Sequence, residues 1–372
     1  MSTKRLTSLD ALRGIAALSV VFWHWQHFFA LSGTWQTGWR REMQPFYWAL
    51  KPLYLQGWAA VDLFFVLSGF GFFWLYSEKI AARGIGSGRF WLLRFSRLYP
   101  LHFALLIVSA VLQAIYFREV GTFFIYQDND VGHFVANVFM VQAWWPHVPQ
   151  TFDGPAWSVS IEVLLYVVFF IACRTGLRAG WPSLAIAALG IPLLWFDEHI
   201  ARGVMGFFMG GTAFAAWRVL RSHAAAVTIT RALGVLAVAL WVLLAVMLWR
   251  ESSLVAGAET NWHFLLAFDL ALCPVTVLAL ALHESTSRRS YARVAFLGDI
   301  SYATYLLHFP MQLALVLLVV RYGVAPTFFM QGWVLIAFYA VLIAAGAAVF
   351  YGFEKPMQDW LRGRKTVPAV VV

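Results

Sequence analysis

Residues 232–249 read ALGVLAVALWVLLAVMLW, an apolar stretch without a single charge that lies between Arg231 and Arg250. A helix needs about 20 apolar residues to cross a hydrocarbon core of roughly 30 Å. Similar stretches recur along the whole chain of 372 residues. Because a bilayer core holds no water to bond free backbone groups, spans of this length must be helical. The sequence therefore predicts an all-α, polytopic integral membrane protein.

The composition excludes an ordinary soluble globular protein. Apolar residues make up 61% of the chain, charged residues only 12%, and the mean hydropathy is +0.71. A soluble domain carries about 25% charged residues. The two cysteines, Cys173 and Cys273, lie in apolar stretches without the spacing of metal ligands. We therefore expect neither a disulfide framework nor a bound metal.

Apolar stretches between charges predict about ten transmembrane helices. Their ranges are 9–31, 56–77, 98–117, 157–173, 181–197, 199–217, 232–249, 262–283, 299–320 and 331–353. A further stretch, 133–145, is too short to cross and ends before Pro146, so we expect an interfacial or re-entrant segment. No long Pro/Gly/Ser linker divides the chain. We expect one membrane domain over 1–372, with a short cytoplasmic tail from about 355 and no appended soluble domain.

The distribution of positive charge predicts the orientation of the chain. With the N-terminus in the cytoplasm, most of the 27 Lys and Arg residues fall in cytoplasmic segments, as the positive-inside rule requires. Counting 133–145 as a crossing would place Arg174 and Arg178 outside, so we reject that alternative. Both termini are then cytoplasmic. This topology accounts for the net charge of +9 better than nucleic-acid binding does, because the basic residues do not share one polar face.

Ionisable side chains within the predicted spans are costly in lipid, so they are candidate functional residues. The first span carries Arg13 and His24, eleven residues apart. This spacing places both on one helix face, about 16 Å apart along the axis. Arg13 is then expected near the cytoplasm and His24 in the outer half of the membrane.

The second and fourth spans bring acidic groups to the depth expected for His24. Asp62 lies about 9 Å below the outer start of the second span by the helix rise, and Glu162 follows Ser158 and Ser160 at the outer start of the fourth. A carboxylate that orients an imidazole, so that the imidazole removes a proton from a hydroxyl, is a common general base in acyl transfer. The alternative is a polar contact that holds the helices together.

The loop after the second span carries Arg89, Arg94 and Arg97 on one helical face, just before Pro100, which we expect to start the third span. Arginine can bind phosphate oxygens through two parallel hydrogen bonds. Together with Arg13, the Arg94 and Arg97 side chains are candidates for binding an anionic cofactor at the cytoplasmic face. Ordinary positive-inside anchoring explains the loop arginines equally well.

Two further spans carry candidate supporting residues. In the ninth span, Ser301, Tyr305 and His308 fall on neighbouring turns of one side. His308 is expected near mid-membrane, where it either contacts substrate or is bonded by a core hydroxyl. Arg202, at the outer end of the sixth span, either supports the substrate or is an interfacial side chain that reaches toward the headgroups.

Tryptophans gather near the outer ends of the predicted spans. Trp144, Trp145 and Trp157 are three of them. They either stack on sugar rings or belong to an interfacial aromatic belt, which is built from the same residues.

Five segments carry motifs in a characteristic order. They are 9–14 (LDALRG) followed by His24, 61–70 (VDLFFVLSGF), 94–100 (RFSRLYP), 157–162 (WSVSIE) and 301–308 (SYATYLLH). Together they resemble the acyltransferase 3 family of bacterial membrane proteins, whose members acylate surface polysaccharides, lipopolysaccharide, peptidoglycan or small glycosides. The resemblance spans essentially the whole chain. It implies that His24 is catalytic, that Arg13, Arg94 and Arg97 serve the acyl-CoA, and that Glu162 belongs to the site.

The expected function is that of a membrane O-acyltransferase in the bacterial inner membrane. Acetyl-CoA is the expected acyl donor, a hydroxyl of a glycan or glycoside on the outer side is the acceptor, and no metal takes part. His24 acts either as a general base or as a group that is itself acylated. Many family members have an acidic or bulky polar residue where this chain has Val163, so no role is expected there. The rival interpretation is a proton-coupled transporter or flippase of a glycan or lipid.

Overall fold

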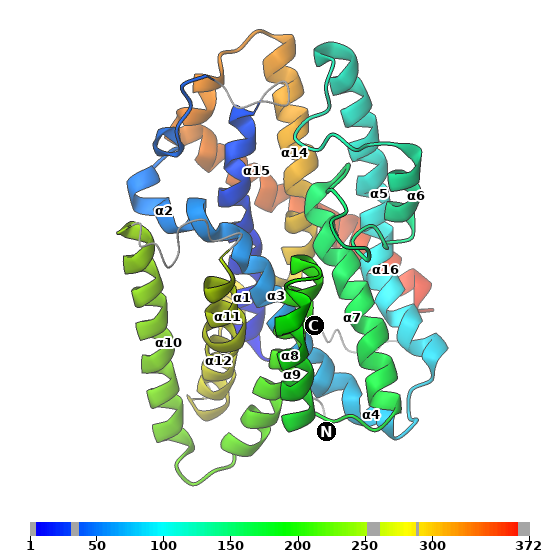
Figure 1. The fold of residues 1–372 in the computed structure, drawn as a ribbon, viewed down its shortest axis with the longest axis vertical. Coiled ribbons are helices and arrows are strands. Elements are labelled where there is room, and N and C mark those ends of the chain that lie inside the picture. Colours follow the sequence, from blue (N-terminus) through cyan, green and yellow to red (C-terminus); the bar gives the residue numbers. More distant parts are fainter. Residues whose placement is uncertain (1–4, 31–36, 251–260, 288–289, 364–372) are drawn as a thin grey trace.

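The structure, a computed structural model, describes residues 5–30, 37–250, 261–287 and 290–363. Within these ranges every regular element is a helix and none is a strand, so the predicted all-α membrane fold is confirmed. Figure 1 shows long helices that pack along one common direction, with α1 (Thr7–His24) inside the bundle. The fold therefore surrounds the helix that carries both Arg13 and His24.

The helices follow one another with short connections. In the first half of the chain they are η1 (Trp25–Phe29), η3 (Arg41–Met43), α2 (Tyr47–Gln56), η4 (Gly57–Ala59), α3 (Ala60–Phe72), η5 (Phe73–Ser77), α4 (Glu78–Ala81), α5 (Ser87–Val120), α6 (Val131–Val138), η6 (Gly154–Ala156) and α7 (Trp157–Arg174). In the second half they are α8 (Trp181–Leu193), α9 (Glu198–Leu220), α10 (Ala226–Trp249), α11 (Trp262–Ala267), η7 (Phe268–Leu272), α12 (Cys273–Ser287), α13 (Ala292–Asp299), α14 (Ser301–Arg321), η8 (Pro326–Met330), α15 (Gly332–Val349), η9 (Phe350–Glu354) and α16 (Lys355–Leu361).

Eight helical segments in the described ranges are long and apolar enough to cross a membrane. They are Tyr47–Ala81, Ser87–Val120, Gly154–Arg174, Glu198–Leu220, Ala226–Trp249, Trp262–Ser287, Ser301–Arg321 and Gly332–Leu361. The two other predicted spans also contain helices, α1, which carries buried charges, and the short α8. The predicted multi-pass membrane protein is thus confirmed, whereas the count of ten crossings and the cytoplasmic side of both termini stay predictions. The segment predicted not to cross contains only the eight-residue α6.

The chain around Pro100 departs from the prediction. Pro100 does not start a span but lies inside the continuous helix α5, which begins at Ser87. Proline is tolerated in such a helix when neighbouring side chains supply hydrogen bonds near it. Here the Tyr302 hydroxyl of α14 donates to the carbonyl oxygen of Leu98 at 2.8 Å. The predicted cytoplasmic tail is also partly helical, since α16 extends to Leu361, and 364–372 lie outside the described residues.

Helices α3 and α9 pack backbone against backbone. A Cβ atom added to Gly69 of α3 would lie 1.8 Å from the Phe207 carbonyl oxygen, and one added to Gly210 of α9 would lie 2.1 Å from that of Val66. Only glycine permits such an approach, which is how small residues bring membrane helices together. The face of α3 that carries Asp62 is therefore turned toward α9.

The start of α1 is fixed by a buried carboxylate from α12. Glu284 accepts hydrogen bonds from the backbone N–H groups of Thr7 at 3.0 Å and Ser8 at 2.8 Å. The first N–H groups of a helix have no partner within the helix, and a negative charge there also complements the helix dipole. Arg5 adds ion pairs with Asp10 and, at 2.5 Å, with Asp299. These contacts set the position of α1 and so of Arg13, one to two turns further along.

Candidate active site

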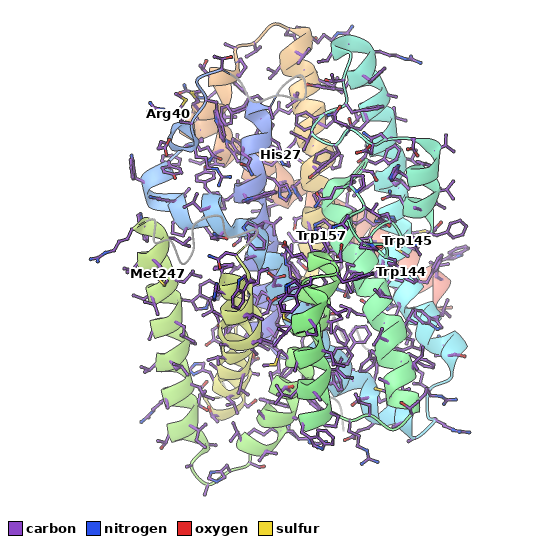
Figure 2. The ribbon with its side chains drawn as sticks, in the orientation of Figure 1. His27, Arg40, Trp144, Trp145, Trp157 and Met247 are labelled. Carbon is purple, nitrogen blue, oxygen red and sulfur yellow. The ribbon has the colours of Figure 1, made fainter. Side chains whose placement is uncertain are left out.

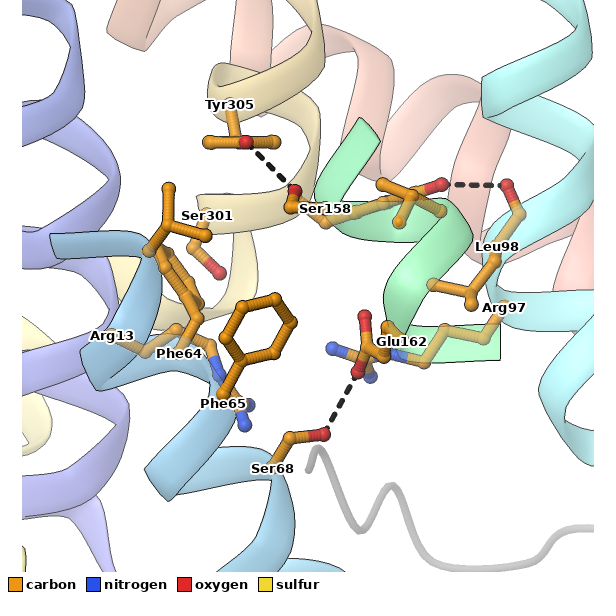
Figure 3. A pocket seen from close by; sticks show the side chains of 13 residues that line it. Arg13, Phe64, Phe65, Ser68, Arg97, Leu98, Ser158, Glu162, Ser301 and Tyr305 are labelled. Atoms are coloured by element: carbon orange, nitrogen blue, oxygen red, sulfur yellow. Dashed lines mark hydrogen bonds between the residues drawn. The ribbon is translucent and has the colours of Figure 1, made fainter. Parts of the chain in front are cut away.

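A cavity between α1, α3, α5, α7 and α14 gathers ionisable and hydroxyl side chains from distant parts of the sequence (Figure 3). Its polar lining consists of Arg13, Ser68, Arg97, Ser158, Glu162, Ser301, Tyr302 and Tyr305. Six residues singled out from the sequence therefore lie around one space: Arg13, Arg97, Ser158, Glu162, Ser301 and Tyr305. The chain is arranged so that motifs more than 280 residues apart face each other.

The charged side chains of this cavity differ in whether the protein supplies them with hydrogen-bond partners. Oε1 of Glu162 accepts hydrogen bonds from Ser68 Oγ at 2.8 Å and from the Tyr166 hydroxyl at 2.5 Å. Among the described residues, none accepts a hydrogen bond from the guanidinium of Arg13 or Arg97, although Arg13 is only 8% exposed. Two arginines and one carboxylate leave the lining with a net positive charge. Such a cavity attracts an anionic group.

Arg94 does not line the cavity that holds Arg97. Its guanidinium lies 4.9 Å from the ring centres of both Phe72 and Tyr76, and its Nη2 donates to the Tyr76 hydroxyl at 2.7 Å. A three-residue step leaves the two arginines about 60° apart around the helix, and the packing of α5 turns Arg94 to Phe72 and Tyr76 while Arg97 lines the cavity. The two arginines predicted to act as a pair therefore do not face the same space.

The predicted catalytic histidine belongs to a cluster of imidazoles. The ring centre of His24 lies 4.9 Å from that of His27 and 4.7 Å from that of His308. All three side chains are buried. Gln312, one turn after His308, donates from its side-chain amide to the carbonyl oxygen of His24 at 3.1 Å. The end of α1 and the middle of α14 are therefore joined at this cluster.

A backbone group orients the His24 imidazole. Nδ1 of His24 lies 2.9 Å from the carbonyl oxygen of Val20. Since a carbonyl can only accept, this nitrogen carries the proton, and Nε2 is the nitrogen with a free lone pair. The ring thus presents an atom that can take a proton from a hydroxyl. A carbonyl serves here in the orienting position where the sequence predicted a carboxylate.

Among the described residues, neither Asp62 nor Glu162 bonds to His24, so the predicted carboxylate that orients the imidazole is not found there. A shared depth of the three side chains stays a prediction. Asp62 is fully buried and bonded to Arg202, with Arg202 Nε 2.8 Å from Oδ1 and Nη2 3.2 Å from Oδ2. Glu162 lies with Arg13 and Arg97 instead. The depth of Asp62 was counted from residue 56, but its helical segment begins at Tyr47. The glycine contacts between α3 and α9 then turn Asp62 toward Arg202 rather than toward α1.

Tyr305 and Ser158 connect the cavity to the histidine cluster. Tyr305 lines the cavity, its hydroxyl lies 2.8 Å from Ser158 Oγ, and its ring centre lies 5.8 Å from that of His308. Nδ1 of His308 bonds to the Tyr305 carbonyl oxygen. His24 itself is not among the residues that line this cavity. Two side chains in succession therefore stand between the cavity and His24. Tyr305 lines the cavity, and His308 lies between Tyr305 and His24.

Ser160 has a different environment from Ser158. Its hydroxyl accepts a hydrogen bond from the backbone N–H of Ala143 at 3.1 Å, and its carbonyl oxygen accepts one from Trp144 Nε1 at 2.9 Å. Ser160 is fully buried and does not line the cavity. Ser160 holds the loop before α7 in place. The support that it gives to the site is therefore the positioning of this loop.

Several residues of the site were not singled out from the sequence. Gln312 and Tyr166 follow His308 and Glu162 by four residues. Residues at this spacing share one face of a helix, so the signal was present beside each predicted residue. Ser68 gave no such signal, because it reaches Glu162 only through the packing of α3 against α7.

Comparisons with known proteins identify the family of the chain. A family described as "Acyltransferase domain" (Acyl_transf_3) matches residues 6–352. Acyltransferase MdmB of Streptomyces mycarofaciens is 27% identical over 98% of this chain and 94% of that protein. Peptidoglycan O-acetyltransferase OatA of Listeria monocytogenes is 26% identical over 45% of this chain and 24% of its own length.

A third relative, "Protein 2 in picA locus" of Rhizobium radiobacter, is 33% identical over 31% of this chain and 47% of that protein. No solved structure is similar enough to count as a match. The family match covers nearly the whole chain, and the relatives that carry an activity in their names are acyltransferases. The chain belongs to the acyltransferase 3 family and is a multi-pass membrane O-acyltransferase.

Proposed function

We propose that the protein transfers an acetyl group from cytoplasmic acetyl-CoA to a hydroxyl of a glycan or glycoside on the outer side of a bacterial inner membrane. The observation that carries this proposal is the cavity lined by Arg13 and Arg97, whose wall residue Tyr305 packs on the histidine cluster. The two guanidinium groups lack protein acceptors in the described chain, so phosphate oxygens of coenzyme A can take that place. Glu162 sits beside them and keeps them from binding phosphate too strongly to release it.

In this proposal the arginines bind the phosphates of coenzyme A, and the acetyl group at the other end of the cofactor has to reach His24. The helix rise puts Arg13 and His24 about 16 Å apart along α1, a distance of the order that an extended pantetheine arm covers. The route passes Tyr305 and Ser158, whose hydroxyls face each other at the end of the cavity. Movement of the Tyr305 side chain opens this route in our proposal.

The chemistry assigns one proton transfer to His24. Nε2 accepts the proton of the acceptor hydroxyl while the hydroxyl oxygen attacks the thioester carbonyl carbon. The new C–O ester bond forms, the C–S bond breaks, and the leaving thiolate of coenzyme A takes a proton back from His24. A covalent variant, in which His24 is acylated first and then passes the group on, balances equally and uses the same nitrogen.

The test uses the full chain in lipid nanodiscs with radiolabelled acetyl-CoA. Release of coenzyme A and label transfer are compared for the wild type, His24→Ala and the control His223→Ala, which changes an exposed histidine between α9 and α10. Loss of a general base costs typically about 10²–10⁴-fold in rate. We expect this loss for His24→Ala and full activity for His223→Ala. Equal turnover in all three removes His24 from the reaction.

The same assay separates the two chemical routes. A burst of labelled protein without any acceptor identifies the acyl-histidine route, whereas release of coenzyme A only after acceptor is added, without labelled protein, identifies the general base. The rival function is tested in sealed proteoliposomes, where glycan movement across the membrane without acetyl-CoA consumption would identify a transporter.

A further inference from the structure

A second pocket lies where the loop after α6 folds over the starts of α7 and α9. Its lining includes Gln142, Trp145, Thr151, Asp153, Trp157 and His199. Figure 2 shows Trp144, Trp145 and Trp157 grouped near the start of α7. None of these residues belongs to the arginine cavity, whose lining starts one residue later on α7, at Ser158. The two pockets are therefore neighbours on either side of one short segment.

Two hydrogen-bond acceptors in this pocket have no partner in the described chain. They are Oδ1 of Asp153 and Oε1 of Gln142, on side chains that are 5% and 8% exposed. The amide nitrogen of Gln142 donates to the Ala156 carbonyl oxygen at 3.1 Å, which fixes Oε1 as the unpartnered atom. Burial raises the pKa of the Asp153 carboxyl well above its usual range. A buried acceptor without a donor is costly, so this pocket lacks donors that a ligand can supply.

Asp197 and Thr151, two other polar residues of the pocket, are bonded within the protein. Asp197 caps α9 through the Ile200 N–H at 2.9 Å and also accepts from the His147 N–H at 3.2 Å. Thr151 Oγ1 accepts from the Asn137 amide at 2.9 Å. Among the described residues of this lining, the buried oxygens without a partner are thus Asp153 Oδ1 and Gln142 Oε1.

Indole rings complete the pocket. Trp157 packs edge to face on His199, with ring centres 4.3 Å apart, and Trp145 is 56% exposed at the pocket. Small-molecule sites combine such aromatic walls with a few placed polar groups. A pyranose ring offers C–H faces for indole and hydroxyl donors at its edge. Building on the proposed function, we propose that this pocket binds the acceptor as a hydroxyl-bearing pyranoside, whose hydroxyls donate to Asp153 and Gln142.

The position of the pocket suits an acceptor site. The segment after Asp153 contacts the donor cavity, because the Pro155 carbonyl oxygen accepts from the Tyr305 hydroxyl at 2.8 Å. It also contacts the histidine cluster through Tyr126. A Cβ atom at Gly154 would lie 2.0 Å from Cζ of Tyr126, and the Tyr126 ring centre is 6.1 Å from that of His27. Donor cavity, histidines and pocket thus meet around Gly154 and Pro155.

The test measures glycoside binding without any acyl donor. Methyl β-D-glucopyranoside and methyl N-acetyl-β-D-glucosaminide are titrated into the full chain in nanodiscs, and tryptophan fluorescence and heat are recorded. The variants are Asp153→Ala, the conservative Asp153→Asn, and Trp145→Ala. Matched controls are Asp128→Ala, an exposed acid in the loop before α6, and Trp181→Ala, an indole 79% exposed at the start of α8. Coenzyme A binding by the same samples checks that each variant is folded.

We expect saturable binding of at least one glycoside by the wild type and both controls, with affinity reduced at least 10-fold in Asp153→Ala and Trp145→Ala. Asp153→Asn should lose less affinity, because an amide oxygen can still accept. Absence of saturable binding by the wild type, or equal affinity in all variants, overturns the inference. Transfer of acetyl to a glycoside that neither substitution affects overturns it too and leaves the proposed function standing. Glycoside binding that depends on Asp153 in a protein that never consumes acetyl-CoA supports the pocket and removes the proposed function.

Discussion

Two buried arginine sites in this molecule have opposite surroundings. Arg202 of α9 makes two hydrogen bonds to Asp62 of α3, at 2.8 and 3.2 Å, and its guanidinium lies 4.4 Å from the ring centre of Trp58 and 5.3 Å from that of Trp157. Arg13 and Arg97 face an open cavity, and no described residue accepts a hydrogen bond from either. The Arg202 guanidinium has carboxylate partners within the protein, Asp62 and, at 3.3 Å, Glu198, whereas the guanidinium groups of Arg13 and Arg97 have none among the described residues.

This contrast separates a structural charge from a functional one. Charged residues in predicted spans made both sites candidates for function in the sequence. Position within a span does not tell whether a charge has a partner. A buried ion pair whose bonds are all made holds helices together. A buried cation beside a cavity is available to an anionic ligand.

The largest effect is expected from Asp62→Ala. The substitution breaks the buried ion pair and leaves Arg202 with the 3.3 Å contact to Glu198. Removal of one partner of a buried ion pair typically destabilises a protein by about 3–5 kcal/mol. We expect a strong loss of folded protein and of melting temperature. The double variant Asp62→Ala with Arg202→Met should regain part of that stability, because the buried guanidinium is removed together with its carboxylate partner. If the Asp62→Ala protein melts like the wild type but no longer consumes acetyl-CoA, Asp62 is catalytic. The distinction between a structural Arg202 site and a functional Arg13 and Arg97 site would then be wrong.

A smaller effect, confined to the donor, is expected from Arg13→Ala and Arg97→Ala. Loss of a hydrogen bond to a charged group costs about 1.5–3 kcal/mol, so the KM for acetyl-CoA should rise roughly 10- to 100-fold. Melting temperatures should stay close to that of the wild type, since neither guanidinium bonds to the protein. Arg89→Ala, an exposed arginine on the same helix as Arg97, is the matched control. A large decrease in melting temperature without a change in KM would show that both arginines have a structural role, as Arg202 has.

The smallest effect is expected from Tyr305→Phe. The hydroxyl that joins Ser158 and the Pro155 carbonyl oxygen is lost, at about 1 kcal/mol for a neutral hydrogen bond. We expect a decrease of roughly fivefold in the rate of acetyl transfer. Tyr339→Phe, which removes a comparable bond to the Leu18 carbonyl oxygen away from the cavity, should leave the rate unchanged. Equal rates for both variants would show that Tyr305 only fills space.

The sequence predicted the helices better than the neighbours of each charge. Apolar length alone located the helices, because a bilayer permits little else. The placement of Arg13, Arg97 and Glu162 in one cavity was only partly foreseen, since Glu162 was assigned to His24. Depth along a helix follows from residue counting, but the face that a helix turns to its neighbour depends on contacts such as Gly69 on Phe207. Those contacts pair Asp62 with Arg202, and no local pattern encodes them.

The most direct test of this account is calorimetric titration of coenzyme A into the full chain in nanodiscs, with the wild type compared to Arg97→Ala and Arg89→Ala. The account predicts saturable binding by the wild type and Arg89→Ala, and at least 10-fold weaker binding by Arg97→Ala at an unchanged melting temperature. Equal affinity for coenzyme A in all three proteins would contradict it.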